Sequence, residues 1–131
     1  MKGGVRVKDT TVLIIEDNMV NLKLVRGILR RLGIKTLEAT DAETGIVIAR
    51  ERKPDLIIMD IELPNMDGIK ATKILKNDEV TRHIPIVAVT AFAMNGDRET
   101  ILAAGCDEYI SKPFKLKEFT ETVKKFLDRK D

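Results

Sequence analysis

The chain has 131 residues, of which 44% are hydrophobic and 34% are charged, and its formal net charge is +2. This length suits one domain with a well-covered core, and the composition is typical of a soluble globular protein and excludes a disordered chain. The small net charge gives no indication of nucleic acid as a partner. No apolar stretch approaches the roughly 18 residues of a membrane span, so no membrane partner is expected.

The sequence predicts a polar tail followed by one domain in which strands and helices alternate. Residues 1–9 contain glycine and show no periodicity, so we expect a disordered or extended tail, with the domain over 10–129. In chain order the predicted elements are a strand over 11–15, a helix over 20–31, a strand over 34–39, a helix over 42–52, a strand over 55–60, a helix over 68–76, a strand over 86–90, a helix over 95–104, a strand over 108–111 and a helix over 115–129.

The helix predictions rest on apolar side chains that recur at helical spacing. In the helix over 20–31 the expected buried stripe consists of Val20, Leu24, Val25, Ile28, Leu29 and Leu32. In the helix over 42–52, which Asp41 would cap, it consists of Ala42, Gly45, Ile46 and Ala49. In the last helix it consists of Leu116, Phe119, Val123, Phe126 and Leu127. Gly33 is expected to end the first helix as a left-handed cap.

The strand predictions rest on short apolar runs, such as residues 12–15 and 56–59, which are typical of strands buried on both faces. Strands that alternate with helices predict an α/β fold with a doubly wound parallel sheet of five strands and five helices. Each crossover is right-handed and buries the apolar side of its helix, so the helices cover both faces.

The single cysteine, Cys106, excludes an intramolecular disulfide framework and fits a reducing compartment. It follows Ala-Ala-Gly before a predicted strand, where we expect a small buried residue. The N-terminus lacks the apolar region of a signal peptide. The expected location is therefore cytoplasmic.

Polar residues follow several predicted strands, and the carboxyl ends of parallel strands share one edge of the sheet, where open α/β folds bind ligands. The residues at this edge are Glu16, Asp17, Asp60, Thr90 and Lys112. Three carboxylates repel one another and stay together only where a cation holds them. A helix cap formed by Asp17 or Asn18 would explain one acid, whereas a hard divalent cation such as Mg²⁺ explains all three.

Each of the other side chains has an ordinary alternative role. Asp60 could be a metal ligand, a helix cap or a covalent nucleophile, since carboxylates attack phosphorus in aspartyl-phosphate ATPases. Thr90 ends a strand, where threonine is a common residue. Lys112 could be a solvated surface charge or a fixed counter-ion of the carboxylates, and the bond before Pro113 is a candidate for the cis form.

These residues stand in motifs that resemble a response-regulator receiver domain. The motifs are Glu16-Asp17, residues 59–68 (MDIELPNMDG), Thr90-Ala91 and Lys112-Pro113-Phe114. The resemblance covers residues from about 11 to 126 and is strongest to the stand-alone receivers of bacterial phosphorelays, notably over residues 89–94. It implies the flavodoxin-like receiver fold, with strand order 2-1-3-4-5.

The resemblance implies a phosphoacceptor response regulator of a two-component system or phosphorelay. Asp60 would accept a phosphoryl group from a phosphohistidine on a sensor histidine kinase or histidine phosphotransfer protein. Asp17 would bind Mg²⁺ directly and Glu16 through water, with Asp60 and the backbone carbonyl of Glu62 as further ligands. A domain of this kind phosphorylates and dephosphorylates its own aspartate, once per chain, and is not a turnover enzyme.

The resemblance also implies a switch that changes the binding of a downstream effector protein. Lys112 would pair with one phosphoryl oxygen and Thr90 would hydrogen-bond another, while Tyr109 would turn inward as Thr90 moves. Glu62 and Phe92 flank the path of the hydrolytic water in this family. An acid and a bulky ring there predict slow autodephosphorylation. The single histidine, His83, is expected far from this edge and outside the reaction.

Three alternatives remain open from the sequence. The chain could be a receiver excised from a hybrid histidine kinase, although the short polar tail and Met1 favour a stand-alone protein. It could be a small phosphatase with an aspartyl nucleophile, although no Asp stands two residues after Asp60 to act as general acid. It could also be a degenerate receiver that acts only as a scaffold, but every functional position of the family is filled.

Overall fold

The computed structural model describes residues 9–91 and 97–128, which form one five-stranded parallel sheet in the order β2-β1-β3-β4-β5. The predicted fold class and strand order are therefore confirmed. The expected tail, apart from Asp9, lies outside the described residues. No described helix is long and apolar enough to cross a membrane.

The elements follow the predicted alternation closely. The strands are β1 (Thr11–Ile15), β2 (Lys35–Ala39), β3 (Leu56–Met59), β4 (Ile86–Thr90) and β5 (Glu108–Ser111). The helices are α1 (Met19–Arg31), α2 (Ala42–Arg52), α3 (Gly68–Lys76), α4 (Asp97–Ala103) and α5 (Leu116–Leu127). The predicted start of the fourth helix at Asn95 and the predicted end of the last at Arg129 lie outside the described residues.

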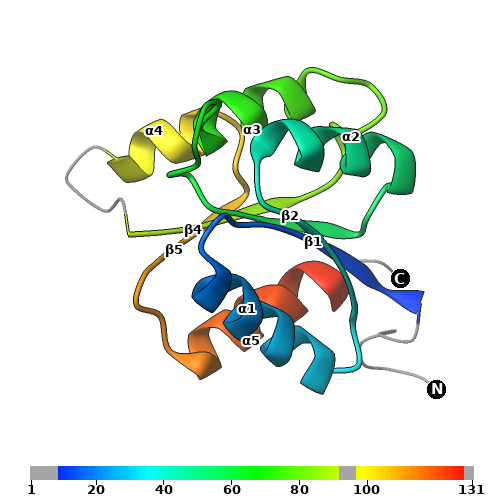
Figure 1. The fold of residues 1–131 in the computed structure, drawn as a ribbon, viewed down its shortest axis with the longest axis vertical. Coiled ribbons are helices and arrows are strands. Elements are labelled where there is room, and N and C mark those ends of the chain that lie inside the picture. The colour runs from blue at the N-terminus through cyan, green and yellow to red at the C-terminus, as the bar shows by residue number, and fades with distance from the viewer. Residues whose placement is uncertain (1–8, 92–96, 129–131) are drawn as a thin grey trace.

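Helices cover both faces of the sheet: α1 and α5 lie on one face, and α2, α3 and α4 lie on the other (Figure 1). Successive strand residues point to opposite faces, so Val12 and Ile14 pack under α1 and α5, while Leu13 and Ile15 pack under α2 and α3. The sheet therefore separates two hydrophobic clusters. Its central strands are buried on both faces, which explains their continuous apolar runs.

Short polar side chains begin three of the helices. Asn18 caps α1, Asp41 caps α2 and Asp67 caps α3, because each side-chain oxygen accepts from a backbone N–H three residues later. The hydrogen bond from Thr44 lowers the pKa of Asp41. Asn18, and not Asp17, is thus the cap of α1. Gly33 has the left-handed conformation expected after α1, with φ of 82°.

Three residues expected in the buried stripes are exposed instead. Val20 and Leu24 on α1 are 76% and 52% exposed, and Leu116 at the start of α5 is 59% exposed. The buried side of α1 contains Leu22, which lies about 200° around the helix from both Val20 and Leu24. The sequence pattern allows two apolar faces on this helix, and the sheet selects the one that contains Leu22.

Candidate functional site

The candidate site lies at the carboxyl edge of the sheet, and backbone hydrogen bonds continue past the strand ends to position it. The amide of Glu16 donates to the carbonyl of Ala39 at 3.0 Å, and the amide of Asp60 donates to the carbonyl of Ile15 at 3.0 Å. The amide of Lys112 likewise donates to the carbonyl of Thr90 at 2.9 Å. Residues from separate loops therefore have their main chains fixed to neighbouring strands.

The structure brings together the three acids that the sequence placed at this edge. Glu16, Asp17 and Asp60 each offer a carboxylate oxygen, and these oxygens lie within 4.8 Å of one another. Glu16 and Asp60 are buried, whereas Asp17 is exposed. A set of oxygen donors with one side open to water suits a hard divalent cation that keeps part of its hydration shell.

Lys112 supplies the positive charge that this cluster needs. Its Nζ atom lies 3.0 Å from Oε1 of Glu16 and 3.4 Å from Oδ2 of Asp60. The peptide bond between Lys112 and Pro113, a candidate for the cis form from the sequence, is cis. The two short distances make the ammonium a counter-ion of two buried carboxylates and not a solvated surface charge.

Burial determines the protonation of Glu16 in the absence of a metal. Desolvation, with a smaller contribution from the hydrogen bond to Asp60, raises the pKa of Glu16 to about 7, although Lys112 opposes the shift. The amide of Asn18 also donates to Oε2 of Glu16 at 3.2 Å. A divalent cation beside Glu16 would favour its ionised form, so metal binding and loss of this proton are coupled.

Asp60 begins a tight loop that leads into α3. Its Oδ1 atom accepts from the amide of Glu62 at 3.0 Å, so the carboxylate is oriented by the main chain that follows it. The side chain of Glu62 is exposed. The segment 60–68 closes when Gly68 donates to the carbonyl of Ile61 at 2.8 Å.

Thr90 and Tyr109 lie on the same face of neighbouring strands. The register pairs Ala88 with Tyr109 and Thr90 with Ser111, so Thr90 and Tyr109 occupy diagonal positions on the face covered by α3 and α4. Thr90 is fully buried, and the half-buried Tyr109 packs against the cluster beneath it. Burial and the charge of Asp97 raise the pKa of Tyr109. Phe92, which the family resemblance places beside the path of the hydrolytic water, lies outside the described residues.

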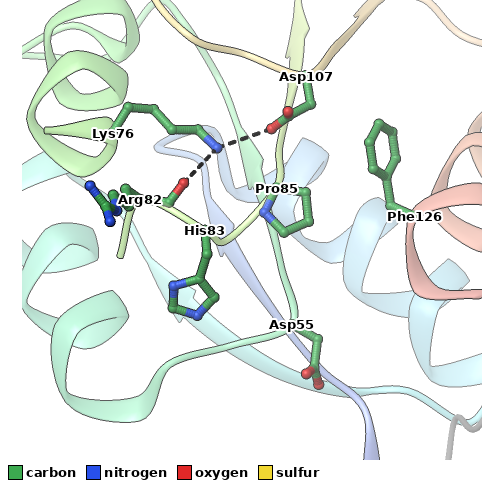
Figure 2. Close-up of a pocket in the computed structure, with 7 residues that line it drawn as sticks. All are labelled: Asp55, Lys76, Arg82, His83, Pro85, Asp107 and Phe126. Atoms are coloured by element: carbon green, nitrogen blue, oxygen red, sulfur yellow. Dashed lines mark hydrogen bonds and ion pairs between the residues drawn. The ribbon is translucent and has the colours of Figure 1, made fainter. Parts of the chain in front are cut away.

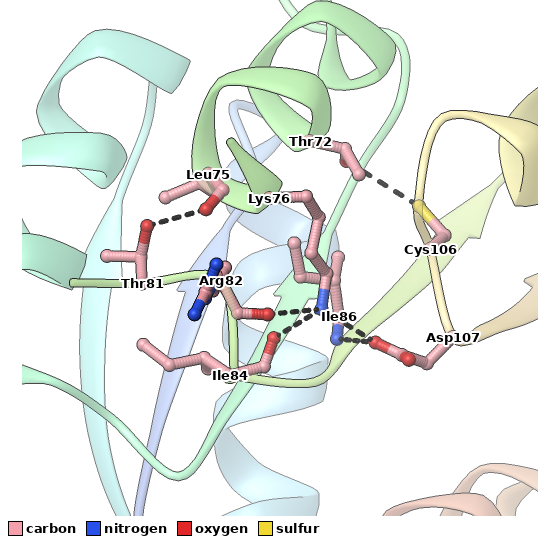
Figure 3. Close-up of polar contacts among 9 residues, drawn as sticks. All are labelled: Thr72, Leu75, Lys76, Thr81, Arg82, Ile84, Ile86, Cys106 and Asp107. Atoms are coloured by element: carbon pink, nitrogen blue, oxygen red, sulfur yellow. Dashed lines mark hydrogen bonds and ion pairs between the residues drawn. The ribbon is translucent and has the colours of Figure 1, made fainter. Parts of the chain in front are cut away.

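His83 lies at the opposite edge of the sheet, as expected. It lines a pocket of about 390 Å³ at the amino ends of the strands (Figure 2). Lys76 crosses this region and donates to the carbonyls of Arg82 and Ile84 at 3.3 and 2.8 Å, and it forms an ion pair with Asp107 at 3.2 Å (Figure 3). These contacts join α3 to the starts of β4 and β5, which is a structural role.

Cys106 also has a structural position beside α3. It is buried, its Sγ atom lies 3.5 Å from Oγ1 of Thr72, and burial raises the pKa of its thiol (Figure 3). A buried thiol with a raised pKa is a poor nucleophile. The expectation of a small buried residue is confirmed.

Gly68 ends the motif over 59–68 and begins the predicted helix, and the structure places it against the main chain of Asp60. A Cβ atom added at Gly68 would lie 2.6 Å from the carbonyl oxygen of Asp60. The local sequence contains one hint of an unusual position: a glycine follows the capping aspartate at a helix start, although glycine has a low helix propensity. The tertiary contact itself leaves no mark in the sequence.

The fold and the acidic cluster with its lysine define a class of signalling domain. The sequence profile of the response regulator receiver domain matches residues 12–124. The chain belongs to the response regulator receiver family. Among curated proteins it is similar to the polar-differentiation response regulator DivK of Brucella anthropi, with 48% identity over 117 residues that span 89% of this chain and 95% of the relative. DivK of Brucella ovis is 49% identical over the same shares.

Solved structures of receivers match the whole fold. The receiver domain of a sensor histidine kinase from Pseudomonas aeruginosa, crystallised with a magnesium ion coordinated in the active-site cleft, gives a TM-score of 0.83 and 35% identity, covering 96% of this chain and 98% of that chain. A two-component response regulator from Clostridium difficile gives a TM-score of 0.86 and 32% identity, covering 92% and 98%.

Proposed function

We propose that this chain is a phosphoacceptor response regulator in which Asp60 accepts a phosphoryl group from a partner phosphohistidine. The observation that carries the proposal is the pair of buried acids, Glu16 and Asp60, which Lys112 joins beside the exposed Asp17. An amide orients the Asp60 carboxylate, and Lys112 lies beside it to pair with charge on an arriving group. Glu16 has contacts of the same two kinds, so the place of Asp60 in the family's motif supports its choice as the nucleophile.

The oxygen donors fit a resident Mg²⁺ ion. Asp17 and Asp60 would hold it directly and Glu16 through a water, with the backbone carbonyl of Glu62 as a further ligand. The magnesium ion in the similar receiver from Pseudomonas aeruginosa supports this assignment. When bound, the ion would neutralise charge on the phosphoryl oxygens. Without a cation, three carboxylates would oppose an incoming dianion at close range.

In the proposed reaction an Asp60 oxygen attacks the phosphorus of the phosphohistidine in line, the O–P bond forms and the P–N bond to the imidazole breaks. Lys112 pairs with an equatorial phosphoryl oxygen. Positioning and charge stabilisation are the main demands of phosphoryl transfer, and the chain meets them with groups already fixed by the sheet. Each chain accepts one phosphoryl group, and hydrolysis of the phosphorylated Asp60, which Glu62 and Phe92 are predicted to slow, returns it to the resting state.

The proposed output is a switch between Thr90 and Tyr109. A phosphoryl oxygen on Asp60 would recruit the Thr90 hydroxyl through a charge-assisted hydrogen bond. The diagonal placement of Tyr109 on the next strand supports the coupling, since movement of Thr90 changes the space beside the ring. The surface around α4 and β5 would then change its affinity for a downstream effector protein.

The proposed donors are a sensor histidine kinase or a histidine phosphotransfer protein, and the proposed location is the cytoplasm. The similarity to DivK, which is named a response regulator of polar differentiation, supports a stand-alone role. The similarity to a kinase receiver keeps the alternative of a domain from a hybrid kinase.

The test is labelling with acetyl phosphate in the presence of Mg²⁺. We expect one phosphoryl group per wild-type chain, no labelling of Asp60→Asn, and no labelling when the metal is chelated. Intact-mass measurement gives the stoichiometry. Catalytic release of phosphate from a phosphomonoester, without a labelled intermediate of defined stoichiometry, would favour the phosphatase alternative and contradict the proposal.

A further inference from the structure

Gly68, the first residue of α3, lies against the main chain of Asp60. A Cβ atom at this position would be 2.6 Å from the Asp60 carbonyl oxygen, 2.7 Å from Cα of Ile61 and 3.0 Å from Cδ1 of Ile61. Carbon–oxygen contacts of this kind have separations of about 3.3 Å or more, so a methyl group would force a shift of roughly 0.7 Å. Two of the three obstructing atoms belong to the backbone and cannot rotate away.

The backbone that Gly68 contacts is fixed on its other side. The amide of Asp60 donates to Ile15 of β1 at 3.0 Å, so Asp60 lies between the sheet and the start of α3. The carbonyl of Ile61 accepts from Leu63 at 3.1 Å and from Gly68 at 2.8 Å. The residues on both sides of Glu62, Ile61 and Leu63, are therefore held by backbone hydrogen bonds.

We propose that Gly68 is a positioning residue of the phosphoacceptor site. Its missing side chain lets α3 begin in direct contact with Asp60, and this contact fixes the Asp60 carboxylate and the Glu62 carbonyl relative to the metal site. The inference rests on the proposed function and adds to it a residue that touches neither metal nor phosphoryl group.

Comparison with other glycines of the chain supports this role. An added Cβ atom at Gly27 on α1 would have nothing within 4 Å, so no steric clash requires a glycine at this position. At Gly45 the obstructing atoms all belong to the buried side chain of Ile15, and none belongs to a main chain. Of these, Gly68 is the position where the obstacle is the main chain of the nucleophile. A helix start would otherwise accept alanine, which has the higher helix propensity.

The experiment compares Gly68→Ala with Gly27→Ala as the matched glycine-to-alanine control. For each protein we would measure the Mg²⁺ dissociation constant by NMR titration, the rate of acetyl phosphate labelling at saturating Mg²⁺, and the free energy of unfolding. We expect Gly68→Ala to bind Mg²⁺ at least 5-fold more weakly and to be labelled about 10- to 100-fold more slowly, because misplacement of this size disturbs the attack geometry. Gly27→Ala should match the wild type in both site measurements.

The outcomes separate this inference from the proposed function. If the wild type itself is not labelled, the proposed function fails. If the wild type is labelled and Gly68→Ala shows the same metal affinity and labelling rate, positioning by Gly68 is wrong, whatever happens to its stability. If the Gly68→Ala protein does not fold, hydrogen exchange of the wild type provides the test. In the metal-free wild type, the Gly68 amide should be protected from exchange. Exchange as fast as in an exposed loop would overturn the inference.

Discussion

The Nζ atom of Lys112 lies 3.0 Å from Oε1 of Glu16, although 96 residues separate the two in the chain. This ion pair joins the residue after the last strand to the residue after the first. It is largely buried, with side-chain exposures of 17% and 5%, so water screens it little. Lys112 therefore compensates the acids of the resting site, and in the proposed reaction it would also pair with a phosphoryl oxygen.

Replacement of Lys112 by alanine should affect both roles. We expect labelling by acetyl phosphate to slow by about 100-fold, because an electrostatic partner of the phosphoryl group is removed. We also expect the metal-free protein to lose about 1–3 kcal/mol of unfolding free energy, since buried carboxylates lose a charged partner. Labelling kinetics and urea denaturation measure the two effects.

The matched control for this variant is Lys125→Ala. Lys125 also pairs with a carboxylate, Glu108 at 3.3 Å, but its side chain is 60% exposed. Exposed pairs contribute little, so both measurements should stay close to the wild type. Equal effects of the two substitutions would contradict the role assigned to Lys112.

The raised pKa of Glu16 predicts how the stability of the metal-free protein depends on pH. Its folded-state pKa of about 7 lies above the usual 4.5, so the folded protein binds this proton more tightly than the unfolded chain. The unfolding free energy should therefore fall as pH rises through this interval, by on the order of 1–3 kcal/mol. Urea denaturation in chelator from pH 4.5 to pH 7.5 measures the slope.

Two comparisons assign that slope to Glu16. The Glu16→Gln variant cannot ionise at this position, so its stability should change less with pH over the same interval. Saturating Mg²⁺ should likewise reduce the loss at pH 7, since the ionised form is then stabilised by the metal. A wild type and a Glu16→Gln variant with the same slope would show that another group titrates.

The proposed switch predicts different results for two substitutions at Thr90. Thr90→Ser keeps the hydroxyl, so the NMR signals of Tyr109 should shift when beryllium fluoride is added as a phosphoryl mimic. Thr90→Ala should bind the mimic with little change at Tyr109, because the hydrogen-bond donor is missing. The coupling is wrong if Tyr109 responds equally in both variants, or if it fails to respond in the wild type.

Thr36 on β2 offers a test of packing that is independent of the site. Its Oγ1 atom is buried and has no hydrogen-bond partner within the described part of the chain. Replacement by valine keeps the shape and removes the unsatisfied group, so unfolding free energy should rise by about 0.5–1.5 kcal/mol. Thr36→Ser keeps the hydroxyl and should give no gain in the same denaturation experiment.

The sequence predicted most of the fold because its signals are local and agree with one another. Buried strands are apolar throughout, and capping residues begin the helices where periodicity starts. The edge on which Glu16, Asp60 and Lys112 meet followed from the rule that parallel strands end together. The family resemblance added the strand order and the separate roles of the acids.

The remaining features depend on tertiary contacts that local patterns do not encode. Helix α1 has apolar residues on both sides, so periodicity could not decide that Leu22 is buried and Val20 exposed. Likewise, the sequence placed Lys112 beside the acids without selecting its closest partner. The approach of Gly68 to Asp60 joins two elements whose relative position is known only from the folded chain.

The main-chain bonds from Glu16 to Ala39, from Asp60 to Ile15 and from Lys112 to Thr90 have a consequence for how such a protein can diversify. The reactive geometry is held by peptide groups, whose bonding is the same for almost any side chain. Residues on the outer helix surfaces, such as the exposed Val20 and Leu24, can therefore be exchanged while the reactive groups keep their places. A fold of this kind can acquire new recognition surfaces without rebuilding its chemistry.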